Sequence, residues 1–280
     1  MFKEDCLRGR NVVVTGGGTG LGAAMATRFA ELGANLVLTS RNLQHLEAAA
    51  EKMRRFGGKV LTIPCDVRHY DQVEALMEQT ERDLGGIDVL VNNAAGNFLC
   101  PTEDLSPNGF DAVVGIVLNG SFYCTHAAGR RMIASGRGGN ILSIVATYAW
   151  TGSGFVVPSA CAKAGVLAMT QSLGVEWAKY RIRVNAIAPG PFPTEGAWKA
   201  LVPHADADAL AREKVPLKRF GEHHELANLA AYLISDYSGY ITGECVTIDG
   251  GAWLARCGFN ELATMDPETI KPIVQAMRKR

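Results

Sequence analysis

Short apolar runs alternate with longer helical patterns along almost the whole chain, and this alternation constrains the fold most strongly. Continuously apolar strands are typical of strands buried on both faces. Such strands, separated by helices, form a parallel sheet that helices cover on both sides. The predicted strands are residues 11–15, 35–39, 60–63, 88–91, 140–144, 183–187 and 245–248, and the predicted helices include 20–33, 43–56, 71–84, 160–180 and 222–236.

These elements predict the α/β class, with a Rossmann-like doubly wound parallel sheet. No repeat, low-complexity tract or Pro/Gly linker divides the 280 residues, so we expect a single domain over residues 1–280. The segment 191–220 differs, because it carries four prolines and a short helical pattern at 206–213. It follows a predicted strand end, where open sheets bind ligands, and it is predicted to be a substrate lid. The alternative is a long surface loop.

Composition narrows the class of protein. Lys and Arg together number 28, as do Asp and Glu, so net charge favours neither nucleic acid nor membrane as a partner. Seven cysteines are scattered without a C-x-x-C pair, which indicates reduced thiols and neither a disulfide framework nor a metal site. The first residues lack the apolar run of a signal peptide, and no apolar stretch approaches the ~18 residues of a membrane span. We therefore expect a cytoplasmic protein.

A glycine-rich turn lies directly after the first predicted strand and opens a helix. It runs from Thr15 to Gly22, with glycines at 16, 17, 18, 20 and 22. Glycines allow the backbone to turn tightly beside a pyrophosphate, which then lies on the N–H groups of the helix N-terminus. The predicted contacts of this turn with a dinucleotide are Gly16, Thr19, Gly20, Leu21 and Gly22.

Three further strand ends agree with a dinucleotide site. Asp66 and Val67 follow the third strand and suit an adenine contact, and residues 93–96 follow the fourth. Pro189 and Gly190 follow the sixth strand, where a nicotinamide carboxamide would lie. The alternative is that all of these are only tight strand–helix turns. The predicted contacts here are Asp66, Val67, Asn93, Ala94, Ala95, Gly96, Pro189, Gly190 and Phe192.

The end of the second strand predicts which dinucleotide is bound. NAD enzymes place an acidic residue there to hold the ribose 2′-OH, and this chain has none. Arg41 instead can present a planar fork of donors to a 2′-phosphate, and Ser40 can add a hydroxyl. An Arg41 that is simply exposed to water is the alternative. The sequence therefore predicts NADP(H) as the cofactor.

The segment from Ser159 to Gly165 has the layout of the Tyr-x-x-x-Lys helix of short-chain dehydrogenases/reductases, with Ser159 in the tyrosine position and Lys163 retained. That family has a serine thirteen residues before the tyrosine, where this chain has Ala146, and its helix asparagine is out of register here as Asn119. A serine hydroxyl is a much weaker acid than a phenol. Tyr148, two residues after Ala146 on the same strand-end loop, is the predicted replacement, and a packed rim aromatic is the alternative.

Residues 148–163, from Tyr148 to Lys163, closely resemble the 2,4-dienoyl-CoA reductases, a divergent branch of that family. So do residues 92–98, which end in Asn97-Phe98, and the segments 101–108, 117–120, 225–230 and 249–251. The likeness covers nearly the whole chain. The Gly-rich motif is specific only to the family, whereas the set Asn97, Tyr148, Ser159 and Lys163 is much more specific to this branch.

The resemblance implies an NADPH-dependent reduction of 2,4-dienoyl-CoA to 3-enoyl-CoA in fatty-acid β-oxidation, by a homotetramer. Hydride would reach the δ-carbon, Tyr148 and Asn97 would donate hydrogen bonds to the dienolate oxygen, and water would protonate the α-carbon. Lys163 would hold the cofactor and Ser159 would support Lys163 or Tyr148. The alternatives are a reductase of another enone or a carbonyl, and an NADP-binding pseudoenzyme. Candidate cations for the CoA phosphates are Arg68, Lys199, Lys218, Arg219 and Arg256.

Overall fold

Seven parallel strands form one central sheet in the computed structural model, which describes residues 3–194, 211–256, 258, 260, 262 and 266–277. The sheet order is β3-β2-β1-β4-β5-β6-β7, and every neighbouring pair is parallel. The predicted doubly wound α/β fold is therefore confirmed. The strands are β1 (Asn11–Thr15), β2 (Asn35–Ser40), β3 (Val60–Pro64), β4 (Val89–Asn92), β5 (Gly139–Ile144), β6 (Ile182–Pro189) and β7 (Cys245–Ile248).

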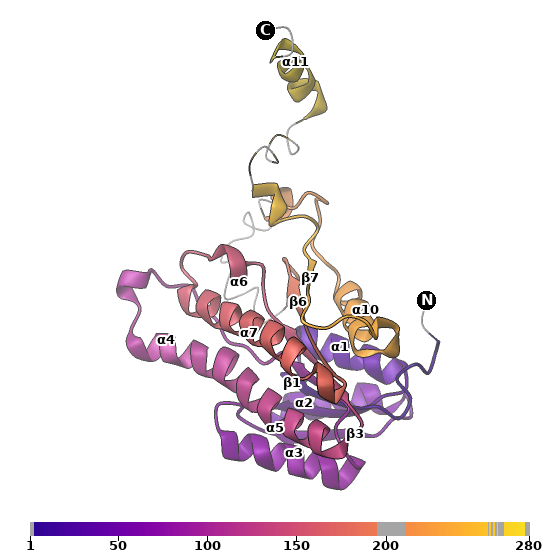
Figure 1. The fold of residues 1–280 in the computed structure, drawn as a ribbon. Helices are drawn as coiled ribbons and strands as arrows, with labels where there is room; N and C mark the ends of the chain where they lie inside the picture. The colour runs from indigo at the N-terminus through magenta and orange to yellow at the C-terminus, as the bar shows by residue number, and fades with distance from the viewer. Residues whose placement is uncertain are drawn as a thin grey trace.

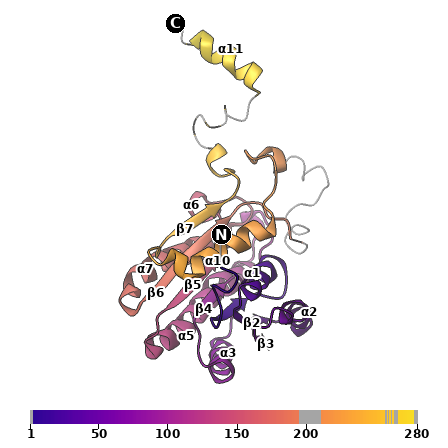
Figure 2. The ribbon, with the colours of Figure 1, turned by 90° about the vertical axis from the view of Figure 1, so that its right-hand side faces the viewer.

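Helices cover both faces of the sheet (Figures 1 and 2). One layer consists of α1 (Gly20–Glu31), α2 (Leu43–Arg54) and α10 (His223–Ile234), and the other contains α3 (Tyr70–Leu84), α5 (Gly120–Ser135) and α7 (Val157–Glu176). A five-residue π-helix, Gly115–Asn119, joins α4 (Pro107–Val114) to α5. The described residues also include the single turn α6 (Tyr148–Thr151) and α11 (Pro267–Met277), which projects away from the body in both views.

The continuous apolar runs follow from burial on both faces of each strand. In β1, Val12 and Val14 belong to the core that also holds Phe29 of α1. Val13, between them, belongs to the opposite core, which holds Leu76 of α3. Successive strand side chains point to opposite faces, so each layer needs its own apolar set and polar positions have no place in the run.

The strand order reverses between β1 and β4, because the chain first builds the sheet outward to β3 and then continues from β4 on the other side of β1. At such a switch point a crevice opens at the carboxyl ends of the strands. Hydrogen bonds between Thr15 and the segment after β4 link the two strand ends at the base of this crevice, and we call them the latch. The Thr15 hydroxyl accepts hydrogen bonds from the N–H groups of Asn93 (2.9 Å) and Ala94 (3.0 Å), while the Asn93 amide donates to the Thr15 carbonyl (3.0 Å). The two strand ends that carry the predicted cofactor segments are thus held at a fixed spacing.

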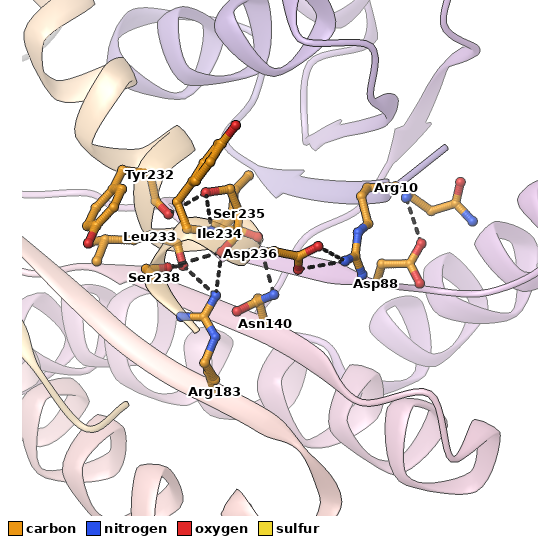
Figure 3. A network of polar contacts seen from close by, with 12 residues as sticks. Arg10, Asp88, Asn140, Arg183, Tyr232, Leu233, Ile234, Ser235, Asp236 and Ser238 are labelled. Carbon is orange, nitrogen blue, oxygen red and sulfur yellow. Dashed lines mark hydrogen bonds and ion pairs between the residues drawn. The ribbon is translucent and has the colours of Figure 1, made fainter. Parts of the chain in front are cut away.

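A second polar network ties together the opposite, amino edge (Figure 3). The Arg183 guanidinium donates to the carbonyls of Leu233 (3.0 Å) and Ser235 (2.9 Å) at the end of α10. A cation at a helix C-terminus satisfies carbonyls that have no partner within the helix. Arg10 meets Asp236 through two hydrogen bonds, at 2.8 and 3.0 Å. These contacts fix α10 against β1 and β6 at the edge remote from the switch point.

Most of the predicted lid cannot be compared with the structure, since residues 195–210 lie outside the described residues. Residues 191–194 leave β6 as irregular chain, and residues 211–213 are helical. Within the described ranges, no helix has the length and hydropathy needed to cross a bilayer.

Candidate active site

The glycine-rich turn is shaped by close backbone approaches. Gly16 has φ +64°, and a Cβ there would lie 2.9 Å from the Asn93 amide nitrogen. A Cβ on Gly22 would lie 2.2 Å from the Gly16 carbonyl oxygen, so a side chain at Gly22 would displace the turn from the first turn of α1. These two glycines are required by the fold of the turn itself.

The N-terminus of α1 offers donors beside this turn. Thr19 is the N-cap in an extended conformation, and its side chain makes no capping hydrogen bond. Four N–H groups at a helix start lack intrahelical partners and favour an anion. Gly20 has φ +53°, and a Cβ on it would lie 3.3 Å from Thr194 Cγ2. The segment after β6 therefore borders the predicted pyrophosphate position.

Arg41 is exposed at the end of β2, whereas Ser40 bonds locally with Asn42 at 3.3 Å. Arg68 forms an ion pair with Asp66, with Nη2–Oδ2 at 2.5 Å. The Arg68 hydrogen bond is the main reason why the pKa of Asp66 is lowered to about 2, and Arg41 adds a smaller attraction. Arg41 therefore approaches this carboxylate while its own guanidinium remains exposed.

The predicted nicotinamide end lies in the loop after β6. Gly190 donates its N–H to the Ile248 carbonyl (2.9 Å), and a Cβ on it would lie 2.5 Å from Asp249 Cβ. Phe192 is buried, with its ring against Gly221, so any contact of Phe192 with a cofactor would come from its main chain. Val67, the predicted adenine contact after β3, is also buried, and a Cβ on Gly120 would lie 2.6 Å from its Cγ2.

Ser159 and Lys163 lie one turn apart on α7, and both are buried. The Lys163 ammonium donates to the Ile144 carbonyl at the end of β5, at 2.5 Å. Burial away from water disfavours the charged amine and lowers the pKa of Lys163 to about 8. At neutral pH the group is a cation held at the base of the carboxyl edge.

Tyr148 begins α6, a single helical turn, and not the loop that the sequence predicted. Its hydroxyl lies 3.0 Å from Ser159 Oγ, within hydrogen-bonding distance. Burial raises the pKa of Tyr148, and the contact with Ser159 only partly offsets that rise. The phenol is therefore protonated throughout the physiological range and acts as a hydrogen-bond donor. Ser159 occupies the family's tyrosine position and brings the hydroxyl of Tyr148 to it.

Asn97 lies half-buried in the segment after β4. Its carboxamide oxygen accepts a hydrogen bond from the Phe98 N–H at 3.0 Å, so the donor capacity of the side chain resides in its NH₂ group. Asn119, the asparagine out of register, is exposed in the last position of the π-helix. The NH₂ group of Asn97 can thus donate in the segment after β4, while Asn119 lies exposed on another element.

One structural residue of the site was missed. Thr15 makes the latch to Asn93 and Ala94, yet in the sequence it is only the last residue of an apolar strand. The sequence signal that could have identified Thr15 is a hydroxyl in the last position of a buried strand, directly before a glycine-rich turn.

The candidate CoA-binding cations are mostly engaged within the protein. Arg68 pairs with Asp66, Lys218 with Glu213 at 3.0 Å, and Arg219 with Glu225 at 2.7 Å. Lys199 and the side chain of Arg256 lie outside what the structure describes. A CoA phosphate would have to compete with a carboxylate for each of the three described cations.

Comparison with known proteins shows the family to which this chain belongs. The sequence model of the family described as enoyl-(acyl carrier protein) reductase matches residues 16–252. A probable 2,4-dienoyl-CoA reductase [(2E)-enoyl-CoA-producing] of Bacillus subtilis is 47% identical over 87% of this chain and 96% of its own length. A probable 2,4-dienoyl-CoA reductase 3 [(3E)-enoyl-CoA-producing] of Caenorhabditis elegans is 42% identical over 100% of this chain and 93% of its own.

Among solved structures, a short chain dehydrogenase from Bacillus anthracis superposes with a TM-score of 0.85 and 48% identity, over 90% of this chain and 100% of that chain. The parallel sheet, the glycine turn and the buried lysine of α7 define a short-chain dehydrogenase/reductase. Within that family, this chain belongs to the 2,4-dienoyl-CoA reductase branch.

Proposed function

We propose that this protein reduces 2,4-dienoyl-CoA thioesters to 3-enoyl-CoA with NADPH, within fatty-acid β-oxidation. The observation that carries the proposal is the contact between Tyr148 and Ser159 at 3.0 Å, one turn from Lys163. In this contact a half-buried phenol lies beside the position that the family's usual tyrosine occupies. The names of the relatives support the same substrate class.

The described residues fit a nicotinamide dinucleotide. The side-chain-free turn at Gly16 and Gly22 leaves the backbone accessible, and the uncapped start of α1 suits a pyrophosphate. Arg41 would hold the 2′-phosphate and the Lys163 ammonium would hold the nicotinamide ribose. When bound, the reduced nicotinamide supplies the hydride of the reaction.

The chain's own residues would stabilise the negative charge that the substrate develops. After hydride reaches the δ-carbon, the electron pair moves through the conjugated system to the thioester oxygen. Tyr148 and Asn97 would donate hydrogen bonds to this oxygen. Because the raised pKa of Tyr148 keeps the phenol protonated, it donates a hydrogen bond without giving up its proton. A proton from water then adds to the α-carbon, and the remaining double bond lies between the β- and γ-carbons.

The names of the relatives differ in the product, since one is (2E)-enoyl-CoA-producing and another (3E)-enoyl-CoA-producing. Both products start from hydride at the δ-carbon and differ in whether the α- or the γ-carbon receives the proton. Water protonates a dienolate fastest at its α-carbon, and this protonation leaves the double bond between the β- and γ-carbons. We therefore propose the 3-enoyl product.

The test of the proposed function follows reduced-nicotinamide absorbance with NADPH and 2,4-hexadienoyl-CoA, with acetoacetyl-CoA as a ketone control. We expect rapid oxidation with the dienoyl thioester and little with the ketone. In D₂O the product should carry deuterium at C2, as read by NMR. Turnover of the ketone alone would refute the substrate class, deuterium at C4 would refute the 3-enoyl product, and binding of NADPH without turnover would indicate a pseudoenzyme.

NADPH preference depends on Arg41 in this proposal. A charge-assisted pair with phosphate contributes about 1.5–3 kcal/mol, so Arg41→Ala should lower kcat/KM for NADPH about 10–100-fold. The value for NADH should stay within about threefold, because NADH lacks the 2′-phosphate. Arg55→Ala removes an exposed arginine just beyond the other end of α2 and is the matched control. Equal losses with both cofactors would contradict the assignment.

We also propose that four copies assemble, as the family resemblance implies. Large apolar side chains are exposed on the outer helices, among them Phe122 of α5 (49% exposed) and Val175 of α7 (82%). Exposed large apolar side chains on the outer helices suit an interface between copies. Light scattering after size exclusion would measure the mass, and a monomer at micromolar concentration would refute the tetramer.

A further inference from the structure

Phe155 adopts a backbone conformation that is rare for its residue type. It has φ +63°, in the left-handed region that favours glycine, and a bulky side chain there is an outlier. It lies in the loop between α6 and α7, after Gly152 at φ +68°. Strain of this kind persists where the surroundings enforce it, often beside a functional site.

A hydrogen bond across the site holds this loop in place. The Phe155 carbonyl accepts from the Cys100 N–H at 2.9 Å. This bond joins the loop that follows Tyr148 to the segment that follows Asn97. The two proposed oxyanion donors thus lie on the two segments that meet at Phe155.

The meeting point is apolar and exposed. Phe155 is 61% exposed, and Trp150 on α6 and Phe98 and Leu99 on the opposite segment are exposed as well. Residues 89–102 and 138–162 contain no Asp, Glu, Lys or Arg. We call Phe98, Leu99, Trp150 and Phe155 the apolar rim. Exposed apolar side chains gathered beside a site suit a hydrocarbon ligand and offer nothing to a phosphate.

We infer that the apolar rim binds the hydrocarbon chain of the acyl group beyond the diene, and that Phe155 sets the preference for chain length. The inference rests on the proposed function and specifies its substrate as dienoyl thioesters of medium or longer chain. The left-handed backbone presents the Phe155 ring outward while the Cys100 bond fixes its position. A ring held in this way contacts the chain with little loss of conformational entropy on binding.

The experiment compares 2,4-hexadienoyl-CoA with 2,4-decadienoyl-CoA. A fully buried methylene contributes up to about fourfold in affinity, so four methylenes on an open rim should raise kcat/KM about tenfold in the wild type. Phe155→Asn removes the ring but keeps a residue that tolerates the left-handed region. For this variant we expect kcat/KM to rise less than about threefold from hexadienoyl-CoA to decadienoyl-CoA. Its kcat/KM for hexadienoyl-CoA should stay within about threefold of the wild-type value.

Three further variants separate contact from backbone effects. Phe155→Gly also lacks the ring and should behave like Phe155→Asn, whereas Phe155→Tyr keeps it and should retain the chain-length effect. Ser153→Ala changes an exposed residue of the same loop and should leave the effect intact. Equal loss for both substrates in Phe155→Asn would overturn the inference, since the loop would then only position Tyr148. An unchanged chain-length effect would also overturn it.

A binding measurement keeps this result separate from the proposed function. Kd values for hexanoyl-CoA and decanoyl-CoA, from calorimetry in the presence of NADP⁺, do not require turnover. A tighter Kd for decanoyl-CoA that Phe155→Asn abolishes supports the rim even if dienoyl-CoA is not reduced. A Kd independent of chain length in the wild type overturns the rim, whatever the assay of dienoyl-CoA shows.

Discussion

Replacing Tyr148 by phenylalanine should lower kcat for 2,4-dienoyl-CoA about 10²–10³-fold, the scale for loss of one oxyanion donor. The ring, half-buried where α6 begins, keeps its packing, so the melting temperature and NADPH binding should change little. The loss should appear in kcat, because the donor acts on charge that the thioester oxygen gains in the transition state of hydride transfer. Steady-state kinetics with hexadienoyl-CoA measure it. Wild-type kcat in this variant would remove Tyr148 from the mechanism.

Ser159→Ala is the matched control for that variant. Ser159 contacts the Tyr148 hydroxyl at 3.0 Å, and we assign it the role of a positioning residue. Its loss should lower kcat less, by about tenfold, because the phenol remains although less well oriented. The double variant should be little worse than Tyr148→Phe alone, since residues that act as one unit are not additive. Full additivity would mean that the two hydroxyls act independently.

The strands were predictable because burial on both faces requires a continuous apolar run in the sequence. The run Val12-Val13-Val14 must serve two cores, so it is uniformly apolar whatever the rest of the chain does. The π-helix at Gly115–Asn119 has no such sequence pattern. The extra residue in its turn depends on how α4 packs against α7. The register of Asn119 therefore could not be settled from the sequence.

The site was predictable as a set of residues but not as a set of pairs. Tyr148 and Ser159 are separated by a loop whose path depends on Phe155 and its bond to Cys100, and no local pattern encodes that path. Asp66 and Arg68 were assigned to different ligands, whereas they bond each other. Ion pairs depend on side-chain conformations that the order of residues does not specify.

Lys163 should give the second large effect. Lys163→Met keeps the length of the side chain but removes a buried cation that donates to the Ile144 carbonyl. Losing a buried charged contact to the cofactor should lower kcat/KM for NADPH about 10²–10³-fold, since such hydrogen bonds are strong where water is excluded. Lys179→Met, on the short helical turn after α7, is the control and should retain activity. A loss confined to protein stability would assign Lys163 a purely structural role.

The pH dependence distinguishes charge from shape at Lys163. With the pKa of Lys163 lowered from 10.5 to about 8, the free enzyme loses this cation as pH rises through about 8. In the wild type, kcat/KM for NADPH should then fall about tenfold per pH unit above that point, whereas Lys163→Met should be flat over the range. The lowered pKa of Lys163 also makes the free energy of unfolding depend on pH. Between pH 8 and 10.5 the unfolded chain binds a proton that the folded chain has released, so this group makes unfolding harder as pH rises. An alkaline fall in kcat/KM that persists in Lys163→Met would show that another group carries the charge.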